Sequence, residues 1–178
     1  FGGCATDFID PEMGVSLVKV LNRLGVEVSF PQKQNCCGIP ALYSGDKETA
    51  TEMAEQNVLA MLEDDPDYVI TPCPTCTLSL KRDFVELLED NPALASKAKR
   101  LSEKTYDASA FIANVLNGGE EFKGKASAEK ITYHDSCHLK RGSGVWQEPR
   151  ALLTTAGKEL EEMAHSDRCC GFGGSYSF

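Results

Sequence analysis

The sequence predicts an α/β protein of two pseudo-repeats, each with a largely parallel sheet and helices on both faces. Two observations lead to this fold class. Apolar residues recur alternately at helical and at strand spacing along the chain. In addition, Cys4 and Cys137 lie 133 positions apart, and the same distance separates Cys36-Cys37-Gly38 from Cys169-Cys170-Gly171. Several matches at one distance indicate an internal repeat.

The elements of the first half begin with a clear helix signal, since Asp10 is a good cap and Pro11 suits the first helical position. In chain order we expect a helix over 10–25, a strand over 26–30, a helix over 46–65, a strand over 67–71 and a helix across 80–88. The second half repeats this alternation, with a helix over 108–116, a strand over 130–133, a helix over 150–156 and a strand over 159–165.

Strands that alternate with helices predict a parallel sheet with right-handed crossovers. Each group of cysteines follows a predicted strand. Because ligands of such sheets collect at the carboxyl ends of the strands, we expect the cysteine loops to converge there.

The repeat divides the chain into two expected domains, 1–105 and 106–178. The first carries a complete cysteine set that ends in Cys73-Pro74-Thr75-Cys76. The counterparts of Cys73 and Cys76 would fall at positions 206 and 209, beyond Phe178. We therefore expect the second copy to be truncated, without its C-terminal Cys-x-x-Cys.

Composition excludes several classes of protein. The formal net charge is −9, so a surface for nucleic acid or anionic lipid is not expected. The apolar runs are far shorter than the roughly 20 residues that span a bilayer. With 42% hydrophobic and 25% charged residues, the chain is that of an ordinary globular protein.

Eight cysteines are the unusual feature of the composition. Adjacent cysteines such as Cys36-Cys37 bridge only with strain, so we expect reduced thiols that bind metal and not a disulfide framework. Soft thiolates favour zinc or an iron–sulfur cluster. A structural zinc site takes four ligands in short-spaced pairs, whereas the first copy offers five cysteines, which fits a cluster better.

The cysteine pattern resembles that of the cysteine-rich CCG domain family, which includes a component of heterodisulfide reductase and the iron–sulfur component of glycolate oxidase. Within it, the sequence is most similar to the lactate-utilization protein A family. The words that carry this resemblance are Pro11-Glu12-Met13-Gly14, Asn35-Cys36-Cys37-Gly38, Thr132-Tyr133-His134-Asp135-Ser136-Cys137-His138 and Cys169-Cys170-Gly171-Phe172-Gly173-Gly174.

The resemblance implies that the cysteines hold a [4Fe-4S] cluster of non-cubane type. By this likeness the first copy binds one cluster and the second copy would contribute to another in a longer chain. The first set is Cys4, Cys36, Cys37, Cys73 and Cys76, and the second is Cys137, Cys169 and Cys170.

The function expected from the resemblance is that of a cytoplasmic iron–sulfur oxidoreductase subunit in the oxidation of L-lactate to pyruvate. Its partners would be flavin or ferredoxin-type subunits of the same complex, because no such motif occurs in this sequence. Two alternatives stay open. One is a heterodisulfide or disulfide reductase subunit whose cluster acts on the substrate, and the other is a zinc-stabilised structural module.

Charged side chains near the second cysteine set have two interpretations each. His134 and His138, and with less reason His165, could relay protons or donate to cluster sulfur, or they could satisfy strand-end carbonyls. Lys140, Arg141 and Arg168 could bind a carboxylate or could be solvated surface charges. The histidines at 134 and 138 are the weak catalytic candidates.

Overall fold

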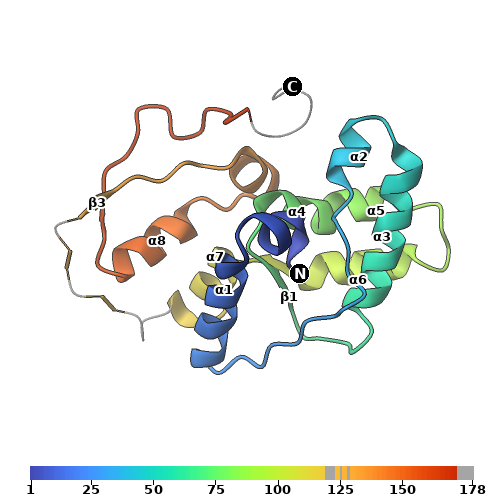
Figure 1. Cartoon of the computed structure of the whole chain (residues 1–178), viewed down its shortest axis with the longest axis horizontal. Coiled ribbons are helices and arrows are strands. Elements are labelled where there is room, and N and C mark those ends of the chain that lie inside the picture. Colours follow the sequence, from blue (N-terminus) through green and yellow to red (C-terminus); the bar gives the residue numbers. More distant parts are fainter. Residues whose placement is uncertain (119–122, 125, 128, 172–178) are drawn as a thin grey trace.

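The computed structural model describes residues 1–118, 123–124, 126–127 and 129–171 (Figure 1). The chain mixes helices with short strands, as the sequence predicts. The helices of its first half are η1 (Ala5–Ile9), α1 (Pro11–Arg23), α2 (Ile39–Tyr43), α3 (Lys47–Met61), α4 (Pro74–Leu78), η2 (Ser79–Asp83), α5 (Phe84–Leu87) and α6 (Ala95–Lys104). Those that follow are α7 (Ala108–Asn114), η4 (His138–Gly142) and α8 (Gln147–Thr155).

Two small parallel sheets are present in the described part of the chain. In the first, β1 (Val69–Thr71) pairs with β2 (Thr105–Asp107), and Ile70 is opposite Tyr106. In the second, β3 (Lys130–Ile131) pairs with β4 (Glu159–Leu160), and Ile131 is opposite Leu160. Both pairs are parallel, as expected, but each described sheet has two strands.

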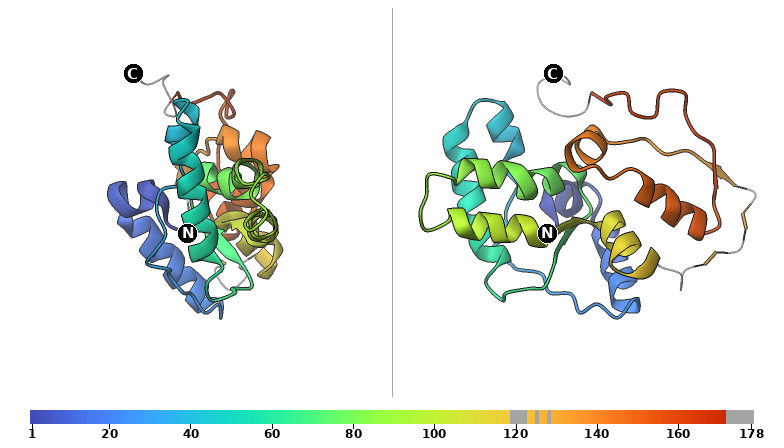
Figure 2. Two further views of the ribbon diagram at one scale, coloured as in Figure 1. Left: turned by 90° about the vertical axis from the view of Figure 1, so that its right-hand side faces the viewer. Right: turned by 180° about the vertical axis from the view of Figure 1, so that it is seen from behind.

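The hydrophobic core lies in the first half, where α3, η2, α5 and α6 pack together beside β1 (Figure 2). Its fully buried side chains include Val58, Leu80, Phe84 and Leu101. The sulfur-bearing side chains of Cys37 and Cys76 belong to the same cluster. Core packing therefore fixes the backbone from which two of the candidate ligands project.

In the described residues, the second half packs against the first at two places. The π-helical turn η4 contacts α4, and α7 contacts β1. After α8 the chain runs largely in extended form along one edge of the molecule (Figure 1). The contact of η4 with α4 matters most, because Cys137 directly precedes η4 and Cys73 directly precedes α4.

Several backbone features recur at the repeat distance of the cysteines. The π-helical turns η1 and η4 occupy positions 133 residues apart, although π-helix is rare in proteins. Gly38 and Gly171 are also 133 residues apart, and their φ angles are 76° and 72°. The backbone geometry is thus similar at these two pairs of positions 133 residues apart.

The predicted helices over 10–25, 46–65, 108–116 and 150–156 correspond to α1, α3, α7 and α8. The helix expected across 80–88 instead begins at Pro74 and passes through the π-turn η2. The strand predicted over 26–30 was wrong, since these residues form no strand in the described structure. The strand over 159–165 is limited to β4.

Sequence patterns missed α6 and β2. Helix α6 buries Ala98 and Leu101 and is otherwise rich in lysine, arginine and serine, so its apolar stripe is narrow. Strand β2 has three residues, of which two are polar and buried. None of the helices in the described segments combines the length and the hydropathy that crossing a bilayer requires.

Candidate functional site

The Cys36-Cys37 loop is held in place by a buried polar side chain from α3. Asn57 is fully buried, and its Nδ2 donates to the carbonyl of Cys36 at 2.9 Å and to Oδ1 of Asn35 at 2.8 Å. Its Oδ1 accepts from the Asn35 amide at 2.9 Å. Nearby, Ser79 Oγ donates to the carbonyl of Cys37 at 3.1 Å. These bonds satisfy the polar groups of a loop that the core encloses.

Gly38 allows the chain to turn sharply after the two cysteines. Its φ angle of 76° lies in the left-handed region. A Cβ at this position would lie 3.3 Å from both the Cα and the carbonyl oxygen of Ala50 in α3. Conformation and space together require glycine here, and α2 begins at the next residue.

Cys73 and Cys76 are placed by the end of β1 and the start of α4. Cys73 precedes the first residue of α4, Pro74, which suits the first helical position. The Cys73 carbonyl accepts from the amide of Thr77 at 2.9 Å and from its Oγ1 at 3.0 Å. The side chain of Cys76 points into the core and is 2% exposed.

Four thiols of the first set lie next to one another. The Cys37 thiol is within hydrogen-bonding reach of those of Cys36 and Cys76, and Cys76 reaches Cys73. The hydrogen bonds from Cys36 and Cys76 lower the pKa of the Cys37 thiol, and that from Cys76 lowers the pKa of Cys73. The pKa values of Cys36 and Cys76 are raised because these thiols donate to their neighbours. The group therefore favours thiolate at Cys37 and Cys73.

Cys4 lies at the exposed margin of this group. Its side chain is exposed, and its charge acts on the Cys36 thiol. Gly3, with a φ angle of 72°, brings the preceding backbone close to the core, since a Cβ there would lie 2.8 Å from the sulfur of Cys76. The structure thus brings four of the five first-set thiols into contact and leaves Cys4 beside them.

The residues of the first set fit a thiolate-bound metal group by their chemistry. They are soft donors, and two of them favour the deprotonated form that metals bind. Across the described ranges, no three Cys, His, Asp or Glu side chains are disposed as ligands of a single metal ion. The thiols contact one another, so they would have to move apart to bind a cluster.

The second set is assembled less completely. Two hydrogen bonds join the segment before Cys137 to the loop before Cys169: the Asp135 amide donates to the Ser166 carbonyl at 2.8 Å, and His134 Nε2 donates to the Arg168 carbonyl at 2.8 Å. Cys137 is half-buried, whereas Cys169 and Cys170 are exposed.

A buried ion pair that the sequence analysis missed supports the second set. Asp135 is 2% exposed and accepts from Arg150 at 2.6 and 3.0 Å, from Lys140 at 3.1 Å and from Ser166 at 2.9 Å. The Arg150 guanidinium lies over the ring of Tyr133, 5.1 Å from its centroid. Arg150 lowers the pKa of Asp135 well below its usual range. The available signal was an acidic residue two positions after the predicted strand over 130–133.

The side chains of His134, His138, Lys140 and Arg141 make contacts within the protein, whereas His165 and Arg168 contact each other through backbone groups. His134 satisfies a backbone carbonyl, which is the structural alternative considered for it. His138 Nδ1 lies 2.8 Å from Oγ1 of Thr75, a residue that stands between Cys73 and Cys76 in the sequence. Lys140 pairs with Asp135 and Asp167, and Arg141 donates to the Asp167 carbonyl. His165 accepts, through its carbonyl, from the amide of Arg168.

Comparison with known proteins gives the family. The cysteine-rich CCG domain matches residues 1–81 and 131–178 of this chain. Lactate utilization protein A of Bacillus velezensis is 41% identical over 178 residues, which cover 99% of this chain and 73% of the relative. The chain belongs to the lactate utilization protein A family.

Further members of the family agree with this assignment. Lactate utilization protein A 2 of Bacillus cereus strain Q1 is 36% identical over 175 residues, and lactate utilization protein A 1 of a Bacillus anthracis strain is 35% identical over 175 residues. Each alignment covers 98% of this chain and 71% of the relative. These relatives therefore contain residues outside the part that this chain matches.

Proposed function

We propose that this chain is an iron–sulfur electron-transfer subunit in lactate utilization, with a [4Fe-4S] cluster on the first cysteine set. The observation that carries the proposal is the convergence of Cys36, Cys37, Cys73 and Cys76, with Cys4 at their margin. Family membership adds the likeness to proteins that are named for lactate utilization. When bound, a cluster accepts and donates single electrons.

The residues around the thiols would hold and tune such a group. Asn57 and Ser79 fix the carbonyls of Cys36 and Cys37, so the two adjacent sulfurs keep one orientation. Because Cys37 and Cys76 are buried in the core, water is excluded from one side of the thiol group. Exposure of Cys4 leaves the other side open to a redox partner.

The two halves would act as consecutive CCG repeats, 1–105 and 106–178. The shared π-turns and left-handed glycines at the repeat distance support this division. The Thr75–His138 hydrogen bond of 2.8 Å joins the loop of Cys73 and Cys76 to the turn after Cys137. A cluster on each set would therefore lie on neighbouring loops.

The reaction served would be oxidation of L-lactate to pyruvate, which releases two electrons and two protons. The cluster would pass these electrons singly to flavin or ferredoxin-type partner subunits in the cytoplasm. Histidines 134 and 138 have structural partners here, so we assign them no catalytic step.

Iron and acid-labile sulfide per chain, measured on protein purified without oxygen, test the cluster. We expect about four of each, and their loss in Cys37→Ser. The control is Val58→Ala, which removes buried core packing and keeps every thiol. Retention of iron by the control shows that cluster loss does not follow from weakened folding alone. About one zinc and no iron would refute the proposal and indicate a structural module.

Lactate dependence needs a separate measurement. An extract of cells lacking this protein is supplemented with the anaerobically purified chain, and pyruvate formation from L-lactate is followed. Restoration by the wild-type chain and not by Cys37→Ser is the expected result. Equal restoration by both would contradict a cluster-dependent role, and reduction of an added disulfide without lactate would favour the reductase alternative.

A further inference from the structure

His138 connects the second half of the chain to the loop that carries Cys73 and Cys76. Its Nδ1 shares a hydrogen bond of 2.8 Å with Oγ1 of Thr75, and both side chains are half-buried. The two residues are 63 positions apart in the sequence. The bond therefore belongs to the tertiary structure and holds the loop from outside.

Thr75 is in direct contact with a thiol of the first cysteine set. The backbone amides of Thr75 and Cys76 donate to the sulfur of Cys73. The hydroxyl group of the same threonine meets His138, so a single residue joins the imidazole to the sulfur. A displacement of Thr75 would change the hydrogen bonds that the sulfur of Cys73 receives.

The ring of His138 also contacts the helix that follows the two adjacent cysteines. It lies edge-on to the ring of Tyr43, with the ring centroids 6.3 Å apart and an angle of 65° between the planes. Tyr43 is the last residue of α2, and the amide of the first residue, Ile39, donates to the sulfur of Cys37. His138 thus contacts both helices, α2 and α4, whose amides donate to sulfurs of the first set.

The turn that presents His138 is packed firmly against α4. Leu139, the next residue, is 3% exposed. Gly142, at the end of η4, lies so close to the end of α4 that a Cβ there would be 2.6 Å from Cδ2 of Leu78. Since both ends of η4 contact α4, the imidazole is held in place by the packing of its own turn.

We propose that His138 is a positioning residue for the thiols of the first cysteine set. By bonding to Thr75 and packing against Tyr43, it fixes the amides that donate to Cys73 and Cys37. The effect on a bound cluster rests on the proposed function, whereas the effect on the thiols does not. In this role His138 neither transfers a proton nor binds substrate.

The expected effect on a cluster has a definite direction. Amides that donate to the sulfurs of a cluster stabilise its reduced, more negative form and so raise its reduction potential. Loosening the loop of Thr75 weakens this donation to Cys73. Loss of the His138 contact should therefore lower the potential.

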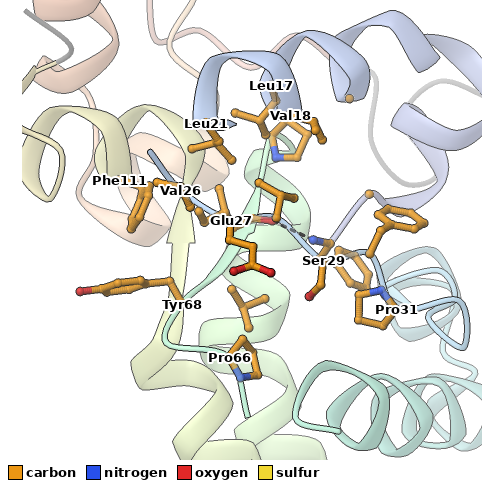
Figure 3. A pocket seen from close by; sticks show the side chains of 18 of the residues that line it. Leu17, Val18, Leu21, Val26, Glu27, Ser29, Pro31, Pro66, Tyr68 and Phe111 are labelled. Carbon is orange, nitrogen blue, oxygen red and sulfur yellow. Dashed lines mark hydrogen bonds between the residues drawn. The ribbon is translucent and has the colours of Figure 1, made fainter. Parts of the chain in front are cut away.

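The variants separate the hydrogen bond from the bulk of the side chain. His138→Ala removes the bond and the ring contact, His138→Asn keeps a polar atom near the position of Nδ1, and Thr75→Val removes only the hydroxyl group. The matched control is His134→Ala, because His134 bonds to a backbone carbonyl of the second half. The fold control is Leu21→Ala. Leu21 is buried in the apolar groove beside α1 (Figure 3), and among the described residues that line this groove there is no cysteine or histidine.

The first measurement needs no metal. In reduced, metal-free protein, the rate at which maleimide labels Cys73 reports how firmly its loop is held. We expect labelling to be about threefold to tenfold faster in His138→Ala and Thr75→Val, as the loss of one hydrogen bond predicts for local opening. His138→Asn and both controls should stay close to the wild-type rate. Unchanged labelling in His138→Ala and Thr75→Val would overturn the proposal, and so would equal acceleration in Leu21→Ala.

The second measurement is the reduction potential of protein loaded with iron and sulfide without oxygen. We expect His138→Ala and Thr75→Val to lower it by about 30 mV, the shift of a threefold change in a one-electron equilibrium. His138→Asn should restore it. A wild-type potential in both variants would refute the positioning role, because the contact would then be structural only. If the wild-type chain binds no iron, the proposed function fails while faster labelling of Cys73 still supports the role of His138, so the two failures are distinguishable.

Discussion

Asn57 is the residue whose removal most directly tests how the structure holds the Cys36-Cys37 loop. Its side chain is fully buried and makes hydrogen bonds to Asn35 and to the carbonyl of Cys36. Each such bond contributes about 1 kcal/mol, and unsatisfied partners add to the loss. We expect Asn57→Ala to lower the free energy of unfolding by about 3 kcal/mol, since three bonds are lost.

Urea unfolding of the metal-free protein measures this loss. With a slope of about 2 kcal/mol per molar urea, the midpoint falls by about 1.5 M. The matched control is Gln56→Ala, because Gln56 is adjacent on α3 and bonds to the same loop from the exposed surface. The control should change the midpoint by less than about 0.5 M.

The same variant has a second consequence if the loop positions thiols for a metal group. Asn57→Ala should release iron faster to a chelator than the control does, because the carbonyl of Cys36 loses its anchor. Equal midpoints for Asn57→Ala and Gln56→Ala would refute the reasoning, since burial would then add nothing to these hydrogen bonds.

Three further perturbations test other parts of the structure. Arg150→Met should cost about 3 kcal/mol at pH 7, because it leaves buried Asp135 without its principal partner. Because Arg150 lowers the pKa of Asp135, the stability that this pair contributes is present above about pH 4 and is lost as the pH falls below that value. The difference between the urea midpoints at pH 5 and pH 3 should therefore be smaller in the variant than in the wild type. Gly38→Ala should destabilise the protein by about 1–2 kcal/mol, and by more than Gly45→Ala does. Both glycines have positive φ angles, but a Cβ at position 45 meets nothing within 4 Å. Equal losses of stability on thermal unfolding would contradict a contact between a Cβ at position 38 and Ala50. In metal-free reduced protein, maleimide should label the exposed cysteines, Cys4, Cys169 and Cys170, before the buried cysteines, Cys37 and Cys76, as followed by mass spectrometry. Early labelling of the buried pair would contradict the packed thiol group.

Sequence alone was sufficient for the elements with strong local signals. The cap at Asp10 with Pro11 places the start of α1, and the Asp10 carboxylate does accept from the Met13 amide. The repeated cysteine motifs are sufficient to indicate the family to which the chain belongs. These signals succeed because caps, prolines and short ligand motifs depend on neighbouring residues in the chain.

Tertiary structure decided the features that depend on distant residues. Residues 26–30 have the alternation of a strand but form none, because a strand requires a hydrogen-bonded partner that local sequence does not supply. The anchors Asn57 and Arg150 are recognisable only once the chain brings α3 to the Cys36 loop and α8 to Asp135. The sequence by itself therefore determined which groups are chemically active, and the packing of distant segments determined which of them meet and what holds them in place.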